Sequence, residues 1–180
     1  MLNNITKDFI KKKYFDTLSN ISFDDSNQVS LFESNKKYVN FDIVIKDFFS
    51  DKLLSSCDLL ICKNHKIYLI EFKNSTKVKL NKHKIELKQK ASESWMIIIK
   101  LLFEYNISLD KFLKKYKLIL VIIYKTSENN TNSRNKINKH IAEKESIYFG
   151  LERYKDFYSE IITTDKKTFL EKYDYFDWKK

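Results

Sequence analysis

Residues 57–73, CDLLICKNHKIYLIEFK, decide how this chain folds. They contain two short apolar runs, CDLLIC at 57–62 and IYLIEFK at 67–73, on either side of the polar linker KNHK. Short, β-prone apolar runs around a polar linker of about four residues are typical of a β-hairpin. The stretch therefore predicts two neighbouring antiparallel strands at the centre of the fold.

The position of the hairpin tip sets which residues face each other. If Asn64 and His65 form the tip, the register places Asp58 opposite Glu71, with Cβ atoms about 4.5–5.5 Å apart. Lys73 is two residues past Glu71 and therefore projects from the same face. Two facing carboxylates repel each other, and burying either without a partner raises its pKa or destabilises the fold. The arrangement predicts that a cation binds between Asp58 and Glu71.

Mg²⁺ or Mn²⁺ suits such a pair, because hard divalent cations favour carboxylate, carbonyl and water oxygens. A bound ion would polarise a phosphoryl oxygen and lower the pKa of a bound water. Lys73 could orient or deprotonate the attacking water, or stabilise the phosphorane that forms. The residues thus indicate phosphodiester hydrolysis. The alternative is a hairpin at the sheet edge with a solvated polar face, on which Glu71 and Lys73 pair by chance.

The remaining pattern predicts a single α/β or α+β domain over residues 1–180, with a central mixed β-sheet flanked by helices. The long segment 79–104 carries an apolar stripe at helical spacing, and the apolar run 117–125 is typical of a strand buried on both faces. The other expected elements are helices at 4–19 and 165–173, the latter capped near Thr164, strands at 41–45 and 146–151, and polar loops at 20–27 and 127–140.

Composition restricts the classes of partner and site. The formal net charge of +10 favours a polyanionic partner, although a Lys-rich and Asn-rich composition encoded by AT-rich DNA would give the same charge. The three His residues share no ligand spacing, and one Gly in the whole chain excludes Gly-rich phosphate loops. Cys57 and Cys62 are expected to be buried, inert thiols. With no long apolar segment and no signal core, we expect a cytoplasmic protein that does not enter membranes.

Asp58 on one strand, followed by Glu71-Phe72-Lys73 on the next, resembles the core of the PD-(D/E)xK nuclease superfamily. Cys57 stands where the family name has Pro, a departure that does not touch the chemistry. The resemblance implies a restriction-endonuclease-like core, and residues 28–125 fit the expected order of elements. It implies that Asp58, Glu71 and the main-chain carbonyl of Phe72 bind Mg²⁺ or Mn²⁺, with Lys73 catalytic. The expected substrate is nucleic acid, DNA favoured over RNA, cut to a 5′-phosphate and a 3′-hydroxyl.

The same resemblance suggests further site residues. Members often have an acidic residue on an earlier helix that completes the metal site, and Glu33 is the candidate as the only Glu before the hairpin, unless it is a solvated surface residue. Many also place a Lys or Gln on the helix after Glu-x-Lys, which contacts the scissile phosphate or the water. Helix starts are uncertain by a few residues, so the candidates for this nucleic-acid contact are Lys84, Lys88 and Gln89.

Two other functions remain open from the sequence, because a fold does not establish an activity. One is a catalytically inactive module that binds nucleic acid, which would keep its affinity after Asp58→Ala. The other is a protein-interaction domain, which would show no salt-dependent affinity for DNA. A homodimer is expected only if the protein cuts both strands of a duplex, since that usually requires two sites.

Overall fold

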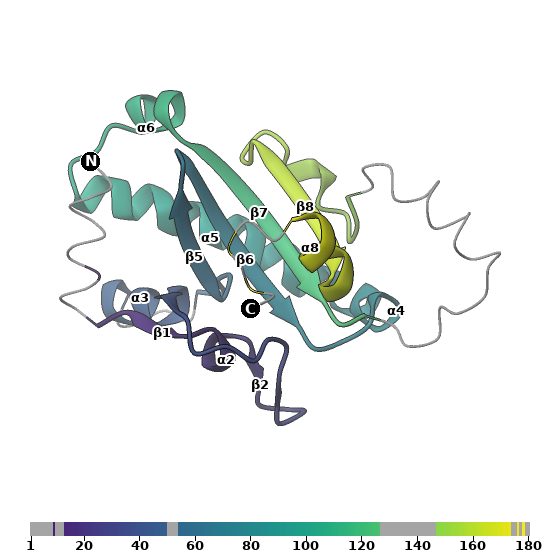
Figure 1. Ribbon diagram of the computed structural model, residues 1–180. Coiled ribbons are helices and arrows are strands. Elements are labelled where there is room, and N and C mark those ends of the chain that lie inside the picture. Colours follow the sequence, from purple (N-terminus) through teal and green to yellow (C-terminus); the bar gives the residue numbers. More distant parts are fainter. Residues whose placement is uncertain are drawn as a thin grey trace.

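The computed structural model describes residues 9, 13–49, 54–126, 147–173, 176 and 178, apart from the side chains of residues 77, 78 and 81. These residues form a mixed α/β fold on a six-stranded sheet of order β1-β4-β5-β6-β7-β8 (Figure 1). The strands are β1 (Phe15–Thr17), β4 (Lys37–Asn40), β5 (Leu59–Lys63), β6 (Lys66–Lys73), β7 (Lys117–Tyr124) and β8 (Glu160–Asp165). The expected central mixed sheet flanked by helices is confirmed.

The sheet is antiparallel from β1 to β6 and parallel from β6 to β8. A separate pair, β2 (Phe23–Asp24) and β3 (Val29–Ser30), lies outside it. The helical elements are α2 (Leu18–Ile21), α3 (Phe41–Phe48), α4 (Lys77–Leu80), η1 (Asn81–His83), α5 (Lys84–Glu104), α6 (Leu109–Lys115), η2 (Glu152–Tyr154) and α8 (Lys166–Lys172). Among the described residues, no helix is long and apolar enough to cross a membrane.

The β5–β6 hairpin has the predicted register, with Cys62 paired to Ile67 and Leu59 paired to Ile70. Asn64 and His65 form its tip with φ values of 51° and 59°. This left-handed backbone matches the right-handed twist of the two strands and is typical of two-residue hairpin turns. The tip residues therefore align the strands as the sequence predicts.

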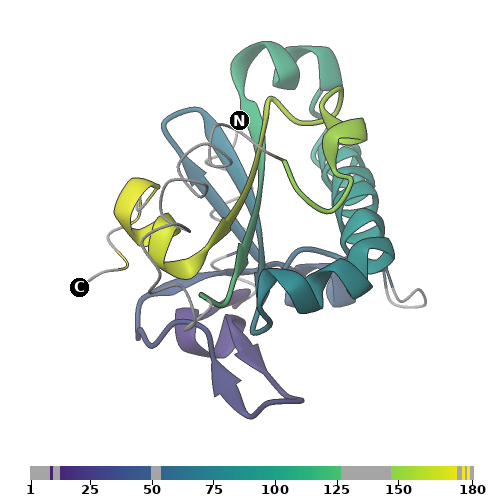
Figure 2. The same cartoon turned by 90° about the vertical axis from the view of Figure 1, so that its right-hand side faces the viewer.

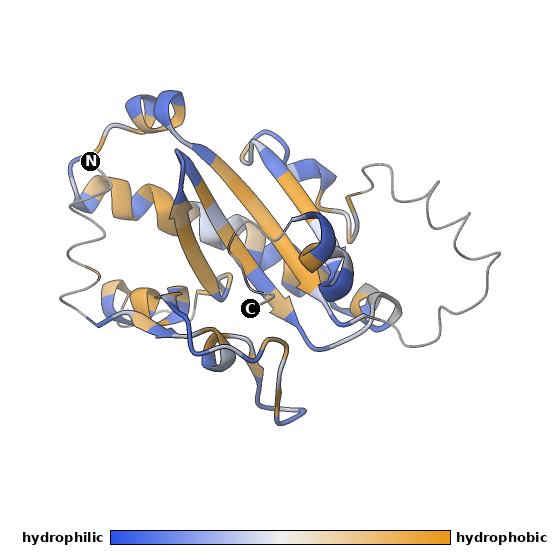
Figure 3. Cartoon of the chain, in the orientation of Figure 1, coloured by the Kyte–Doolittle hydropathy of each residue, from blue (hydrophilic) through white to orange (hydrophobic). Residues whose placement is uncertain are grey.

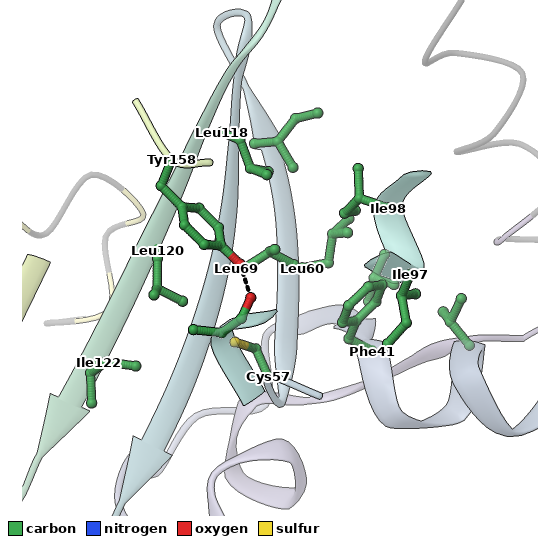
Figure 4. Packing of buried hydrophobic residues seen from close by; sticks show 14 of the residues in the cluster. Phe41, Cys57, Leu60, Leu69, Ile97, Ile98, Leu118, Leu120, Ile122 and Tyr158 are labelled. Carbon is green, nitrogen blue, oxygen red and sulfur yellow. Dashed lines mark hydrogen bonds between the residues drawn. The ribbon is translucent and has the colours of Figure 1, made fainter. Parts of the chain in front are cut away.

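Helices cover the sheet on both faces (Figure 2). The long helix α5 packs its apolar stripe, which includes Leu87, Ala91 and Ile98, onto the face that carries Leu69 and Leu120. Figure 4 shows part of this layer, where Tyr158 lies against α5 and the sheet. β7 is buried on both faces, as predicted, and is apolar over almost its whole length (Figure 3).

The opposite face of the sheet forms a second core cluster. Phe169 of α8 and Trp178 pack there against Phe32, with ring centroids 5.0–6.4 Å apart. Ile70 and Phe72 of β6 point into this cluster. Because side chains alternate along a strand, Leu69, Glu71 and Lys73 must lie on the face covered by α5.

Three element predictions are wrong. Residues 41–45 form part of helix α3 rather than a strand, because the Asn40 side chain caps the helix by accepting from the Ile43 N–H, and Phe41, Val44 and Ile45 share its buried face. Residues 147–151 form no strand, since Phe149 and Gly150 have φ values of 65° and 70°. The strand lies later, at β8.

The third error concerns the second half of the helix expected at 4–19, since 15–17 are strand β1 and a separate short helix follows at Leu18–Ile21; Phe9, in the first half, is helical. Within the expected loop 20–27, residues 23–24 pair as β2. Most of 4–12 and the expected loop at 127–140 lie outside the described residues. The last helix is confirmed as α8, capped by Asp165, whose side chain accepts from the Thr168 N–H.

One of the two cysteines differs from the expectation of buried thiols. Both thiols are free, but Cys57 is buried whereas Cys62 is exposed near the hairpin tip. The last two residues of β5 extend beyond the cover that buries its first three. The expectation of two buried thiols is therefore wrong for Cys62.

Candidate functional site

The site forms where the start of β5, the end of β6 and the first half of α5 meet. Asp58 directly precedes β5, and Glu71 and Lys73 lie on the face of β6 that α5 covers. α5 adds Glu86 and Lys90, which are four residues apart and so lie one turn apart on the same side of the helix. Five charged side chains thus come together from three elements.

Glu71 is the centre of this cluster. Its side chain has no exposed surface, and the Lys90 ammonium donates to both carboxylate oxygens at 2.8 Å. The Lys73 ammonium lies 3.0 Å from Oε1. A carboxylate so completely removed from water stays ionised only if opposite charges and hydrogen bonds compensate the lost solvation. Two ammonium groups provide that compensation here.

Asp58 shares one of these cations with Glu71. The Lys90 Nζ lies 3.3 Å from Oδ1 of Asp58, and the Phe72 main-chain N–H donates to Oδ2 at 2.7 Å. Burial and then the charge of Glu71 raise the pKa of Asp58 well above its usual value, although Lys90 and the Phe72 N–H act in the opposite direction. The two carboxylates therefore meet around one cation, and in this structure that cation is the Lys90 ammonium.

Lys73 is held between two carboxylates. Its ammonium donates to Oε1 of Glu86 at 2.5 Å in addition to its contact with Glu71. Burial alone would lower the pKa of Lys73, but the charge of Glu71 and the hydrogen bonds to both carboxylates raise it above its ordinary value. A lysine with a raised pKa is a poor base at neutral pH. The geometry thus favours Lys73 as a donor or a positive charge over Lys73 as the group that deprotonates water.

A fourth acidic side chain, Asp42, comes from the first turn of α3. The Ser56 hydroxyl donates to its Oδ1 at 2.5 Å. Burial raises the pKa of Asp42, as does the charge of Glu71, whereas Ser56 and Lys90 lower it. Asp42 is itself exposed, but it lies within electrostatic reach of Glu71 and Lys90.

Glu33, the candidate for this acidic position, lies elsewhere. It is exposed on the connection between β3 and β4, while its neighbours Leu31 and Phe32 are buried. The groups that contact the carboxylates of Asp58 and Glu71 come instead from Lys73, Lys90 and the Phe72 main chain. The sequence did not indicate Asp42 as a residue near the site, because the apolar residues 41–45 predicted a strand. The N-cap residue Asn40 was the signal for a helix there.

The three candidates on α5 do not enter the cluster. Lys84 is exposed, and Gln89 is exposed and donates to Glu93 at 2.8 Å. Lys88 is half-buried with its ammonium against Gly150, where an added Cβ would lie 2.9 Å from Nζ. Lys90 is the residue of this run that turns inward. Its signal was its position three residues after Leu87 and four residues before Ser94, which places it on the buried side of α5.

The donor set can be compared with the needs of a divalent cation. Among the described residues, no three His, Cys, Asp or Glu side chains gather as a ready ligand set. Asp58 and Glu71 nevertheless already share one cation. The Ile70 carbonyl accepts from Asp58 N–H and the Lys73 carbonyl from Lys125 N–H, so strand alternation turns the Phe72 carbonyl toward the Asp58 side. Two carboxylates and one carbonyl are chemistry that fits Mg²⁺ or Mn²⁺.

Comparison of the chain with protein-family models, with curated proteins and with solved structures found no match.

Proposed function

We propose that this protein is a metal-dependent nuclease of the PD-(D/E)xK type, with a restriction-endonuclease-like core, that hydrolyses phosphodiester bonds in nucleic acid, DNA favoured over RNA. The observation that carries the proposal is that Asp58 and Glu71 share one cation with the Lys73 ammonium alongside. The order of β4, β5, β6, α5 and β7 supports it, since the resemblance implies such a sheet with a helix after Glu-x-Lys.

In this proposal Asp58, Glu71 and the Phe72 carbonyl would hold Mg²⁺ or Mn²⁺, and Asp42 is a nearby acidic residue on an earlier helix that adds negative charge without belonging to the ligand set. When bound, the ion supplies Lewis acidity and a water of lowered pKa. Lys73, kept protonated by Glu71 and Glu86, orients the attacking water and stabilises charge on the phosphoryl oxygens.

The substrate class rests on charge and position. The chain carries ten more positive than negative charges, and Lys84 and Gln89 are exposed at the start of α5 beside the site. Exposed Lys and Gln side chains at such positions can contact phosphate oxygens without reading the base sequence. Lys88, partly buried against Gly150, would contribute charge from the same turn of the helix.

A second candidate function has its own supporting observation. Lys90 and Lys73 already pair with the two carboxylates, so the cluster is held together by ion pairs without a metal ion. A module that binds nucleic acid but does not cleave it would need no more than this. The protein-interaction domain is a third candidate, which differs in having no affinity for nucleic acid.

The test is to incubate the protein with plasmid DNA, and with single-stranded DNA and RNA that share one sequence, each in the presence of Mg²⁺, Mn²⁺ or a chelator. The proposal predicts metal-dependent cleavage that falls about 100-fold or more in Glu71→Gln and in Lys73→Met. Glu104→Gln and Lys111→Met, which change the same charges at exposed positions, are the matched controls and should cleave normally. Circular dichroism checks that each variant is folded.

Each alternative gives a different result. Salt-dependent binding without cleavage by the wild type would favour the inactive nucleic-acid-binding module. Neither binding nor cleavage would favour the protein-interaction domain. Cleavage that Glu71→Gln retains in full would overturn the assignment of the site.

A further inference from the structure

Lys90 reaches the two carboxylates from helix α5 and not from the hairpin that carries them. Its ammonium lies 2.8 Å from each oxygen of Glu71 and 3.3 Å from Oδ1 of Asp58. These oxygens are the ones that the proposed metal site would use. One small cation can bind between them, and this position is filled by an atom of the protein itself.

We infer that Lys90 is a tethered cation that holds the metal-free site together and competes with the divalent ion for Asp58 and Glu71. The inference rests on the proposed metal site and specifies how that site is regulated. Two cations at such short separation repel each other strongly where water is largely excluded, so the ammonium must leave Glu71 when the ion binds there.

Lys90 is suited to move, whereas Lys73 is not. The Lys90 ammonium pairs with Asp58 and Glu71, which are the two proposed metal ligands, so a metal ion bound there takes the place of both partners. Lys73 pairs with Glu86 as well as with Glu71, and so keeps a carboxylate partner whatever binds to Glu71. The ammonium that a metal ion would displace is therefore that of Lys90.

The charges of the cluster explain why an ion could still bind. Counted as ionised, the acidic residues that pair directly with Lys73 and Lys90, namely Asp58, Glu71 and Glu86, carry three negative charges against two positive charges. One negative charge remains within these pairs, and nearby Asp42 adds to it, so the site attracts a cation, but less strongly than the carboxylates would without Lys90. The tethered ammonium thus stabilises the metal-free protein and weakens its affinity for metal.

The test compares wild type with Lys90→Met, measuring Mn²⁺ binding by electron paramagnetic resonance and the melting temperature with and without Mn²⁺. Without metal, Lys90→Met should melt at a lower temperature, because two buried carboxylates lose a partner. Mn²⁺ should raise its melting temperature by more than it raises that of the wild type. The dissociation constant for Mn²⁺ should fall by about tenfold or more, because no ammonium has to be displaced.

Two further variants make the result interpretable. Lys111→Met removes one positive charge at an exposed position of α6 and should bind Mn²⁺ as the wild type does. The double variant Lys90→Met/Glu71→Gln removes the unpaired charge as well, so it should fold without metal and show no Mn²⁺-dependent rise in melting temperature. If Lys90→Met alone is unfolded without metal, refolding on Mn²⁺ titration, followed by circular dichroism, supports the inference, and failure to refold overturns it.

Equal or weaker Mn²⁺ affinity in Lys90→Met would overturn the competition. Such a result, together with metal-dependent cleavage by the wild type, would leave the nuclease proposal intact. Tighter Mn²⁺ binding by Lys90→Met without cleavage by the wild type would instead support the tethered cation and contradict the nuclease.

Discussion

The Ser94 hydroxyl accepts a hydrogen bond from the Cys57 main-chain N–H at 2.8 Å, and both residues are completely buried. This bond joins the middle of α5 to the residue directly before Asp58. Ser94 lies one helical turn after Lys90, so this hydrogen bond fixes where α5 sits along the strands and thereby positions Lys90 against the two carboxylates.

Ser94→Ala should therefore weaken both stability and the site. The variant leaves the buried Cys57 N–H without its acceptor, and we expect a loss of about 1–3 kcal/mol in the free energy of unfolding, measured by urea denaturation. Ser92→Ala is the matched control, because the Ser92 hydroxyl donates to carbonyls of its own helix, at Lys88 and Gln89. A loss in Ser92→Ala as large as that in Ser94→Ala would contradict this account.

Glu86→Gln should reduce activity while leaving stability nearly unchanged. Glu86 keeps 41% of its side chain exposed, so solvent screens its pair with Lys73 and the free energy of unfolding should change by less than about 0.5 kcal/mol. Loss of the charge frees the Lys73 ammonium to move, and we expect about a tenfold lower cleavage rate. Glu104→Gln at the exposed end of α5 serves as the comparison, and an unchanged rate in Glu86→Gln would show that Glu86 does not position Lys73.

The pH dependence of the same pair has a defined sign. Partial burial acts to raise the pKa of Glu86, but its hydrogen bond and attraction to Lys73 outweigh this and lower it. The pair's contribution to stability is thus present above the pKa of Glu in the unfolded chain and is lost as pH falls through the lowered value. The difference in melting temperature between wild type and Glu86→Gln should accordingly shrink on acidification.

Substitutions at the hairpin tip should test whether its left-handed backbone, which aligns the two strands, contributes to stability. Asn64 has φ of 51°, so Asn64→Val places a β-branched residue in left-handed backbone and should cost about 1–3 kcal/mol in thermal or urea unfolding. Asn64→Gly adopts this backbone without strain and should leave stability equal or slightly higher. Equal losses in the two variants would mean that the backbone at the tip does not determine stability.

Tyr158→Phe should alter stability at high pH as well as at neutral pH. The Tyr158 hydroxyl donates to the Ala91 carbonyl at 2.6 Å, shown by the dashed line in Figure 4, and its loss should cost about 1 kcal/mol at neutral pH. Burial raises the pKa of Tyr158 well above its usual value, so this stabilisation is present below the pKa of Tyr in the unfolded chain. It is lost as pH rises through the folded value.

The stability gap between wild type and Tyr158→Phe should therefore narrow above about pH 10, where an unfolded Tyr ionises. Urea unfolding at several alkaline pH values measures the gap. Tyr154→Phe, which removes a hydroxyl from a less buried ring of the same segment, controls for the other titrating groups. A gap that widens with pH would contradict the assignment.

Local pattern was enough to predict the hairpin, its register, the buried strand β7 and the long helix, because each depends on neighbours within a few residues. The prediction from local pattern failed at α3 because the residues FDIVI have the composition of a strand, and only the N-cap by Asn40 indicates the helix. It failed at 147–151 because apolar aromatic residues hid the left-handed backbone at Phe149 and Gly150. In both places the backbone, and not the hydropathy, determined the element.

The sequence by itself determined that Asp58, Glu71 and Lys73 gather at one end of a hairpin, because strand pairing and side-chain alternation follow from the order of residues. Only the tertiary structure decided which cation the two carboxylates share. The packing of α5 brings in Lys90 and Glu86 and the packing of α3 brings in Asp42, and the angle of a helix against a sheet depends on contacts between residues far apart in the chain.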